Sequence, residues 1–372
     1  MAMTSGDGRD PATRGAGHGR IRGRRRTVAA VLAGGGVALG LGFTLGLGST
    51  AIQAQSPMDA LIAAAKKEGE FVLYSSESDK QMADTNKAFE AKYGIKVRGT
   101  RLVGGAVTSR YAGERQGGTV VADAIVVANE PFVTDNPSWW QALSEANIPG
   151  YDRYPAAARG AHHLVMNYNV IGISWNTNLV KPADEPANYL DLINNPAFAS
   201  KGSIVYADPR ATPSAMNLFK ILVERYGEDF FKKLMERGVA IAASSSPGVQ
   251  QVAAGANKVM IGNFPNNAQS VIAAGGPVKY RPVLDPATGV DNLLALSAGS
   301  KNPNAARLYA AWRISEEGQR VMCLARGSTS PLGELPGCEP AAPPNYIKTD
   351  YRVYSDKAWQ AKYLPWLGLK PL

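Results

Sequence analysis

Apolar residues recur along the chain in two alternating patterns, one with helical spacing and one of short continuous runs. At 79–93, Met82, Phe89 and Tyr93 share one helical face and Gly94 follows as a stop signal. The continuous runs are typical of buried parallel strands. Strands are expected at 71–74, 95–97, 120–127, 171–175, 203–206, 258–263, 278–283 and 292–296, and helices at 58–68, 79–93, 108–116, 214–226, 230–237 and 305–314. This alternation predicts an α/β architecture.

An arginine-rich amino terminus precedes a long uncharged segment. Three consecutive arginines at 24–26 stand just before residues 28–47, which carry no charge and are rich in glycine. Adjacent arginines before a weakly apolar segment favour twin-arginine export, so we expect a signal over residues 1–54 that is cleaved near Ala54. The alternatives are retention of the segment as a membrane anchor and a basic tail that binds nucleic acid.

The expected signal changes what the charge of the chain implies. It carries seven of the 40 basic residues and two of the 31 acidic ones, which leaves 33 basic and 29 acidic side chains. A nearly balanced charge gives no reason to expect a nucleic-acid partner. The remaining 318 residues exceed what one hydrophobic core usually organises, so we expect two lobes in a periplasmic monomer.

The chain has two cysteines, Cys323 and Cys338. In an oxidising compartment they are expected to form a structural disulfide that closes a short loop. A metal site is disfavoured because the pair lacks partner ligands at the usual spacing.

Seven segments, in their order along the chain, carry a family resemblance. They are Val-Leu-Tyr-Ser-Ser at 72–76, Phe-Glu-Ala-Lys-Tyr-Gly-Ile-Lys-Val at 89–97, Ala-Asp-Ala-Ile at 122–125, Gly-Ile-Ser-Trp-Asn-Thr at 172–177, Gly-Pro-Val at 276–278, Asn-Pro-Asn-Ala-Ala at 302–306 and Ser-Glu-Glu-Gly-Gln at 315–319. Together they resemble the type 2 periplasmic solute-binding proteins of ABC importers, in particular the branch of ferric-ion-binding proteins. The similarity covers nearly the whole chain after residue 54.

The resemblance implies two doubly wound α/β lobes joined by a two-strand hinge, with a small solute held between them. Lobe 1 would take residues 55–172, lobe 2 residues 173–282, and residues 283–372 would return to lobe 1 and end in a tail. Closure of the lobes on the solute would be recognised by an ABC permease in the inner membrane. No cofactor is implied.

Parallel sheets bind ligands at the carboxyl ends of their strands, where helix amino termini present free N–H groups. Four loops of the chain qualify, at 75–77, 104–108, 129 and 212–215. Their candidate ligand-binding side chains are Ser75, Ser76, Thr108, Asn129, Thr212 and Ser214. Each also has an ordinary interpretation as a helix cap, and Glu77 is expected to be a solvated first-turn residue.

The chain departs from the ferric-binding pattern of acids and paired tyrosines. Asparagines occupy the corresponding late segment, where Asn263, Asn266 and Asn267 are further candidates, and no two tyrosines are adjacent. Trp175 on the crossover strand could stack on the solute or pack at the hinge. An uncharged polar set with helix amino termini favours an organic or phosphorus-containing anion. Ferric-ion capture is the alternative.

An exported hydrolase is the alternative from another class. His162 and His163 are the only histidines beyond the expected signal, and the chain has no Gly-x-Ser-x-Gly, His-Glu-x-x-His or Gly-x-x-x-x-Gly-Lys motif. We therefore expect no enzymatic activity. A receptor that reports its solute to a membrane sensor would have the same fold and site, so the sequence does not separate it from a transport protein.

Overall fold

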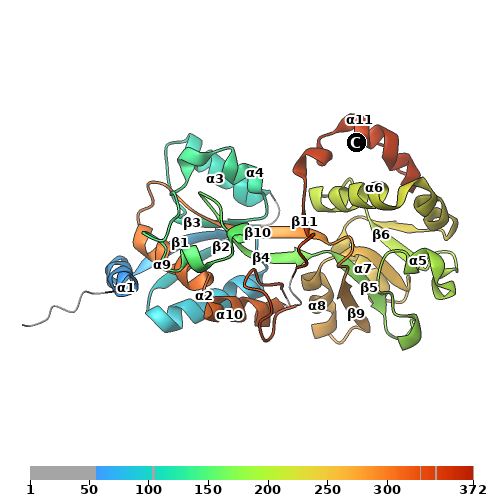
Figure 1. The fold of residues 1–372 in the computed structure, drawn as a ribbon, viewed down its shortest axis with the longest axis horizontal. Helices are drawn as coiled ribbons and strands as arrows, with labels where there is room; N and C mark the ends of the chain where they lie inside the picture. The colour runs from blue at the N-terminus through green and yellow to red at the C-terminus, as the bar shows by residue number, and fades with distance from the viewer. Residues whose placement is uncertain (1–55, 103–104, 327, 340–341, 372) are drawn as a thin grey trace, which may run out of the picture. The chain divides into compact units, whose positions relative to one another are not determined.

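The computed structural model describes residues 56–102, 105–326, 328–339 and 342–371. The expected export signal lies outside these residues. Two β-sheets, each with its own hydrophobic core, make up the α/β fold (Figure 1). We call the sheet that contains β1, with its helices, lobe 1, and the sheet that contains β5, with its helices, lobe 2. Among the described residues, no helix combines the length and the apolar character needed to span a bilayer.

The sheet of lobe 1 runs in the order β11-β10-β3-β1-β2, and β4 also pairs with β10. Strand β1 is parallel to β2 and β3, whereas β10 is antiparallel to β3 and β4. Its strands are β1 Glu70–Ser75, β2 Lys96–Arg101, β3 Ala124–Val127, β4 Leu164–Val170, β10 Thr288–Leu296 and β11 Ile347–Lys348. The accompanying helices are α1 Pro57–Glu68, α2 Asp79–Tyr93, α3 Ala106–Gln116, α4 Glu130–Thr134, α9 Pro303–Arg313 and α10 Glu316–Arg326.

The sheet of lobe 2 runs in the order β7-β6-β8-β5-β9, with β5 antiparallel to both neighbours. Its strands are β5 Gly172–Asn176, β6 Ile204–Ala207, β7 Ala240–Ala242, β8 Val259–Asn263 and β9 Val278–Pro282. Its helices are α5 Asp191–Asn194, α6 Pro213–Glu236, α7 Ser245–Ala253, α8 Pro265–Ala273 and α11 Lys357–Tyr363. The 3₁₀ turns that matter below are η6 Tyr351–Tyr354 and η7 Leu364–Leu367.

Two crossover connections join the strands of the two sheets, from β4 to β5 and from β9 to β10 (Figure 1). Glycine is required at both. A Cβ on Gly172 would lie 2.0 Å from the carbonyl oxygen of Arg281, and a Cβ on Gly289 would lie 2.2 Å from that of Asn169. The backbones approach this closely only because these positions have no side chain. The two sheets and their paired connections confirm the predicted architecture of two lobes and a two-strand hinge.

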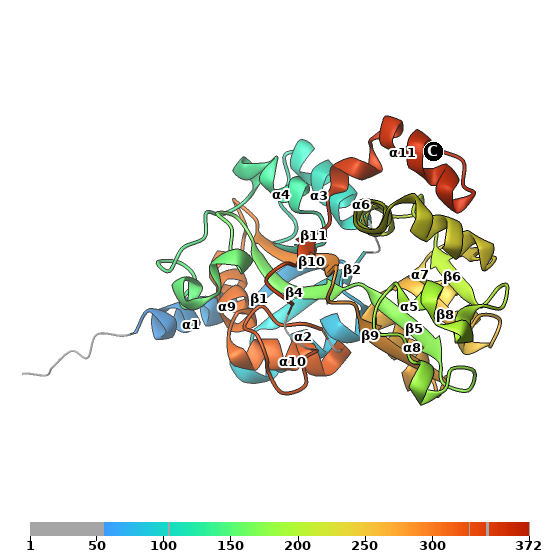
Figure 2. The same ribbon diagram turned by 45° about the vertical axis from the view of Figure 1, so that its right-hand side comes forward.

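The C-terminal segment packs against lobe 2. Val353, Leu364 and Leu367 are buried in its core, and both views place α11 beside α6 (Figures 1 and 2). Earlier in the chain, the structure joins Cys323 of α10 to Cys338 in a disulfide.

Candidate functional site

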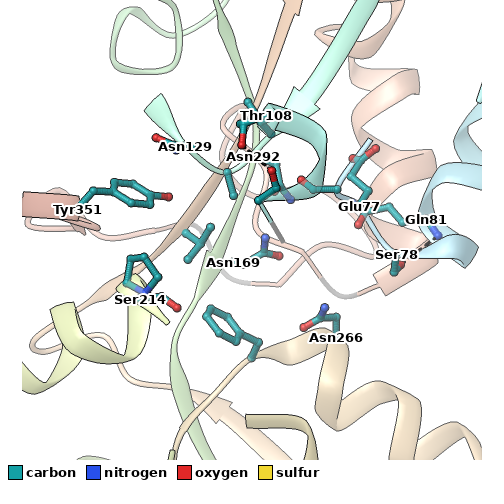
Figure 3. A pocket seen from close by; sticks show the side chains of 17 residues that line it. Glu77, Ser78, Gln81, Thr108, Asn129, Asn169, Ser214, Asn266, Asn292 and Tyr351 are labelled. Carbon is teal, nitrogen blue, oxygen red and sulfur yellow. Dashed lines mark hydrogen bonds between the residues drawn. The ribbon is translucent and has the colours of Figure 1, made fainter. Parts of the chain in front are cut away.

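A cavity of about 390 Å³ lies between the two lobes. Residues of lobe 1, lobe 2, both crossover strands and the C-terminal segment line it (Figure 3). They are Ser76, Glu77, Ser78, Gln81, Gly105, Thr108, Val127, Ala128, Asn129, Asn169, Pro213, Ser214, Phe264, Asn266, Val290, Asn292 and Tyr351. The volume is within the range that small-molecule sites occupy, and most of the lining side chains are polar but uncharged.

The wall from lobe 1 is built at the ends of β1 and β3. The hydroxyl of Ser76, just after β1, donates to the carbonyl oxygen of Val126 at 3.2 Å. Helix α3 starts after Gly105 without a side-chain cap, so its first-turn N–H groups lack a side-chain acceptor. Thr108 donates its hydroxyl to the carbonyl oxygen of Gly105 at 2.7 Å. This wall therefore presents hydrogen-bonding groups that strand ends and helix starts hold in place.

Asparagines form the wall after β3 and the part of the lining that belongs to the crossover strands. The side-chain oxygen of Asn129 accepts from the backbone N–H of Phe132 at 3.2 Å and caps α4. On β4, the oxygen of Asn169 accepts from the amide of Asn167 at 3.1 Å. On β10, the amide of Asn292 donates to the oxygen of Asn167 at 3.1 Å. Within the described chain, the amide nitrogens of Asn129 and Asn169 have no partner and remain available as donors.

The wall from lobe 2 consists of the starts of α6 and α8. Thr212 caps α6 by accepting from the N–H of Ala215 at 3.3 Å, and its hydroxyl lies 3.2 Å from that of Ser214. Helix α8 follows Phe264 and has no side-chain cap. Both helices begin with proline, whose missing N–H and fixed φ suit the first helical position. Helix amino termini from both lobes thus face one cavity.

The acidic side chain of the lining, Glu77, belongs to a buried ion pair. Its carboxylate lies 2.8 Å from the guanidinium of Arg313, and both side chains are fully buried. Arg313 also donates to the hydroxyl of Tyr309 at 2.9 Å, and the hydroxyl of Ser75 donates to Glu77 at 3.2 Å. The expectation that Glu77 is solvated is wrong, because an arginine 236 positions later in the chain supplies its counter-charge.

Uncharged side chains predominate in the lining of the cavity. No lysine or arginine is among the described residues that line the cavity, and Tyr351 is the one tyrosine. Burial, followed by the charges of Asp291 and Glu130, raises the pKa of Tyr351, so its phenol stays protonated. In the part of the chain that the structure describes, no group of three or more His, Cys, Asp and Glu side chains could hold a metal ion.

The cavity brings five of the predicted side chains together, namely Ser76, Thr108, Asn129, Ser214 and Asn266. The other five candidates lie outside its lining. Ser75 is buried and accepts from the N–H of Glu77. Trp175 is 2% exposed in the core of lobe 2, and the guanidinium of Arg281 lies 5.5 Å from its ring.

The remaining three candidates lie close to the lining in sequence. Thr212 caps α6. Asn263 is buried and donates its amide to the hydroxyl of Ser174 at 2.7 Å, while Asn267 donates its backbone N–H to the side chain of Asn266. Contact between any of the ten candidates and a solute stays a prediction.

Six polar or charged residues of the lining were not among the sequence candidates. They are Glu77, Ser78, Gln81, Asn169, Asn292 and Tyr351. Ser78 and Gln81 adjoin a predicted strand end, so a wider window at that loop would have included them. Asn169 and Asn292 are polar residues within the crossover strands, and their polarity could have identified them from the sequence. Nothing in the local sequence around Tyr351 points to a site.

Comparisons with known proteins agree with this geometry. The family model for bacterial extracellular solute-binding proteins matches residues 71–323. Three solved structures are similar at identities that establish the fold alone. The substrate-binding protein of an ABC transporter from Agrobacterium tumefaciens has 16% identity and a TM-score of 0.63, covering 82% of this chain and 96% of its own.

The other two structures carry a bound solute or ion. Iron-bound HitA from Pseudomonas aeruginosa has 17% identity and a TM-score of 0.59, covering 77% of this chain and 94% of its own. The periplasmic binding protein AfuA from Actinobacillus pleuropneumoniae, with fructose-6-phosphate bound, has 19% identity and a TM-score of 0.57, covering 80% and 97%. Because the family model spans well over half of the sequence, this chain belongs to the bacterial extracellular solute-binding proteins.

Proposed function

We propose that this protein is the periplasmic solute-binding component of an ABC importer and captures a small organic or phosphorus-containing anion. The observation that carries the proposal is the cavity between the lobes, to which both lobes and both crossover strands contribute lining residues. A solute in that position would contact both lobes and so favour their closed arrangement. The arginine-rich amino terminus supports export to the periplasm.

The chemistry of the lining supports an anion held by hydrogen bonds. Hydroxyl, amide and helix-start N–H groups surround the cavity, and the carboxylate of Glu77 is neutralised by Arg313. Helix amino termini attract anions because unpaired N–H groups and the helix dipole point at the ligand. A phosphate or carboxylate would therefore find donors from both lobes without a lysine or arginine in the lining. The sugar phosphate bound to AfuA is one ligand of this class in a similar fold.

The experiment is a thermal-shift screen of residues 55–372. The probes are D-fructose 6-phosphate, 2-aminoethylphosphonate, succinate, ferric citrate and putrescine. An acidic organic probe at one hundred times its dissociation constant should add about 2.7 kcal/mol to the free energy of unfolding. Putrescine should produce no shift, because the lining offers no unpaired carboxylate for a cation.

Three results would contradict the proposal. A shift with ferric citrate that a matched citrate control does not give would favour the iron-binding alternative. Steady chemical turnover of a probe would favour an enzyme. No shift with any acidic probe would contradict the proposal that the solute is an anion. The role in transport is tested separately, since deletion of the gene should abolish cellular uptake of the bound probe, whereas a receptor that serves a sensor would leave uptake intact.

A further inference from the structure

The C-terminal strap, which we define as residues 346–354, connects the hinge to lobe 2 and carries Tyr351 to the cavity. Its first anchor is on lobe 1. Strand β11 pairs in parallel with β10, where Ile347 and Lys348 lie opposite Thr288 and Gly289. Just before β11, the hydroxyl of Tyr346 donates to the carboxylate of Asp291 at 2.7 Å. These bonds fix the start of the strap beside a crossover strand.

The second anchor of the strap is on lobe 2. The backbone N–H of Asp350 donates to the side-chain oxygen of Asn217 on α6 at 3.0 Å. The hydroxyl of Tyr354 donates to the carbonyl oxygen of Arg210 at 2.9 Å, and Val353 is buried in the core of lobe 2. Tyr351 lies between these anchors, so the position of its ring is set by contacts on both sides of the hinge.

The hydroxyl of Tyr351 points into the cavity, on the side where Asn129 and Ser214 lie (Figure 3). No described residue makes a hydrogen bond with this hydroxyl, although the lining around it is polar. Burial and two nearby carboxylates raise its pKa, which keeps the proton in place. The hydroxyl of Tyr351 makes no hydrogen bond with Asp291, whose Oδ1 accepts from Tyr346 and whose Oδ2 lies 3.9 Å from the ammonium of Lys348. A protonated phenol without a partner is a hydrogen-bond donor in need of an acceptor.

Two further observations indicate where an acceptor group of the solute would lie. Ser214 is a first-turn residue of α6, whose N–H has no acceptor within the helix, and it lies on the same side of the cavity as Tyr351 (Figure 3). Across the cavity, the side chain of Glu77 is fully buried and paired with Arg313, so that end offers an anionic group no free donor from this pair. Near Tyr351, Lys348 stands 3.6 Å from Glu130 and 3.9 Å from Asp291 and offsets their charges. The free donors therefore converge at the Tyr351 end of the cavity.

We propose that Tyr351 is a specificity-determining residue whose hydroxyl donates to the acidic group of the bound solute, which sits at the Ser214 end of the cavity. The polar, uncharged remainder of such a solute then faces the uncharged hydroxyl and amide side chains of the rest of the lining. The favoured solute class is thus an organic acid whose remainder is polar and uncharged. This inference rests on the proposed function, since it assumes that an anion enters the cavity.

The test compares Tyr351→Phe with Tyr354→Phe by isothermal titration calorimetry against D-fructose 6-phosphate, 2-aminoethylphosphonate and succinate. Each substitution removes only a hydroxyl from the same 3₁₀ turn, but Tyr354 does not line the cavity. For the probe that binds the wild type most tightly, Tyr351→Phe should weaken binding about 10- to 100-fold, the range for a hydrogen bond to a charged group. Tyr354→Phe should leave the dissociation constant unchanged within about twofold.

The uncharged relative of that probe provides the second readout, such as D-fructose for D-fructose 6-phosphate. Tyr351→Phe should lower the preference for the acid over its uncharged relative, because only the acid uses the phenol. Equal losses for both molecules, or equal effects of the two substitutions, would overturn the role of Tyr351 while leaving the proposed function intact. Failure of all three probes to bind the wild type would overturn the anion receptor and this inference together.

Discussion

The buried pair of Glu77 and Arg313 makes a strong prediction about stability, because it stands directly behind the solute cavity. Their side chains are fully buried, and the nearest carboxylate oxygen and guanidinium nitrogen are 2.8 Å apart. Tyr309 and Ser75 complete the network with one hydrogen bond each. Two charges in such a place are tolerated only as a pair, because either one alone would be buried without compensation.

The expected magnitudes follow from that burial. Arg313→Met leaves the carboxylate of Glu77 unpaired and should lower the free energy of unfolding by about 3–5 kcal/mol. Glu77→Met leaves the guanidinium unpaired and should cost a similar amount. The double substitution removes both charges and keeps apolar side chains of comparable length. It should therefore cost much less than the sum of the single substitutions, with a coupling of at least about 2 kcal/mol.

The assay is urea unfolding of residues 55–372, followed by tryptophan fluorescence at pH 7. Arg225→Met is the matched control, since the bridge of Arg225 to Asp285 is exposed and its loss should change stability by less than about 0.5 kcal/mol. The reasoning is refuted if Arg313→Met costs no more than this control. It is also refuted if the two single losses simply add in the double variant, because the charges would then not depend on each other.

Three further predictions concern the cavity, the hinge and the disulfide. Ser214→Asp should abolish binding of the acidic probes, because it places a like charge at the start of α6. Burial raises the pKa of Asp291 to about 6, so the folded state favours its protonated form and stability should fall by about 3 kcal/mol as the pH rises from about 4 to 6. Asp291→Asn should remove this loss. Replacing Cys323 and Cys338 by serine should cost about 3 kcal/mol, the value for a 15-residue loop.

Each of the three has a direct check. Ser214→Asn, which adds similar bulk without charge, should retain more binding than Ser214→Asp, and equal losses would show that size is responsible. In urea unfolding, Asp291→Asn should have the same stability as wild type at pH 4 and should be more stable than wild type at pH 7. A parallel pH dependence in both proteins would assign the effect to another group. The serine variant is compared with wild type in the presence of reductant, where the two stabilities should converge.

The fold could largely be predicted from the sequence because each element carries its own signal. The strand-like stretch at 278–283 corresponds to β9, and Gly94 ends α2 with a positive φ of 70°. The helices expected at 214–226 and 230–237 both lie within α6, and the backbone between them is non-helical at Gly227, where φ is 68°. The predicted break between these two helices is therefore confirmed. The strand expected at 120–127 begins only at Ala124. The backbone N–H of Asp123 still donates to Val72 of β1, and its side chain accepts from the backbone of Lys301 and Asn302.

The candidate site could be predicted only where local rules apply. Ser76, Thr108, Asn129 and Ser214 follow strand ends or start helices, and the cavity includes all four. Tyr351 could not be found in this way, because its position depends on the pairing of β11 with β10, some 60 residues earlier in the chain. Residues that long-range contacts bring to a site leave no periodic signal in their own neighbourhood.

We expect the crossover strands to link solute contact to movement of the lobes. Asn169 on β4 and Asn292 on β10 line the cavity, and these same strands lead into the two connections between the lobes. Gly172 lies against the backbone of Arg281, and Gly289 against that of Asn169, too closely for a side chain. We expect the paired strands to keep this separation when the lobes move. We therefore expect closure to occur by changes in the backbone of residues 283–287, which join β9 to β10. A solute that contacts Asn292 then biases the lobe arrangement, and by linkage the lobe arrangement alters its affinity to the same degree.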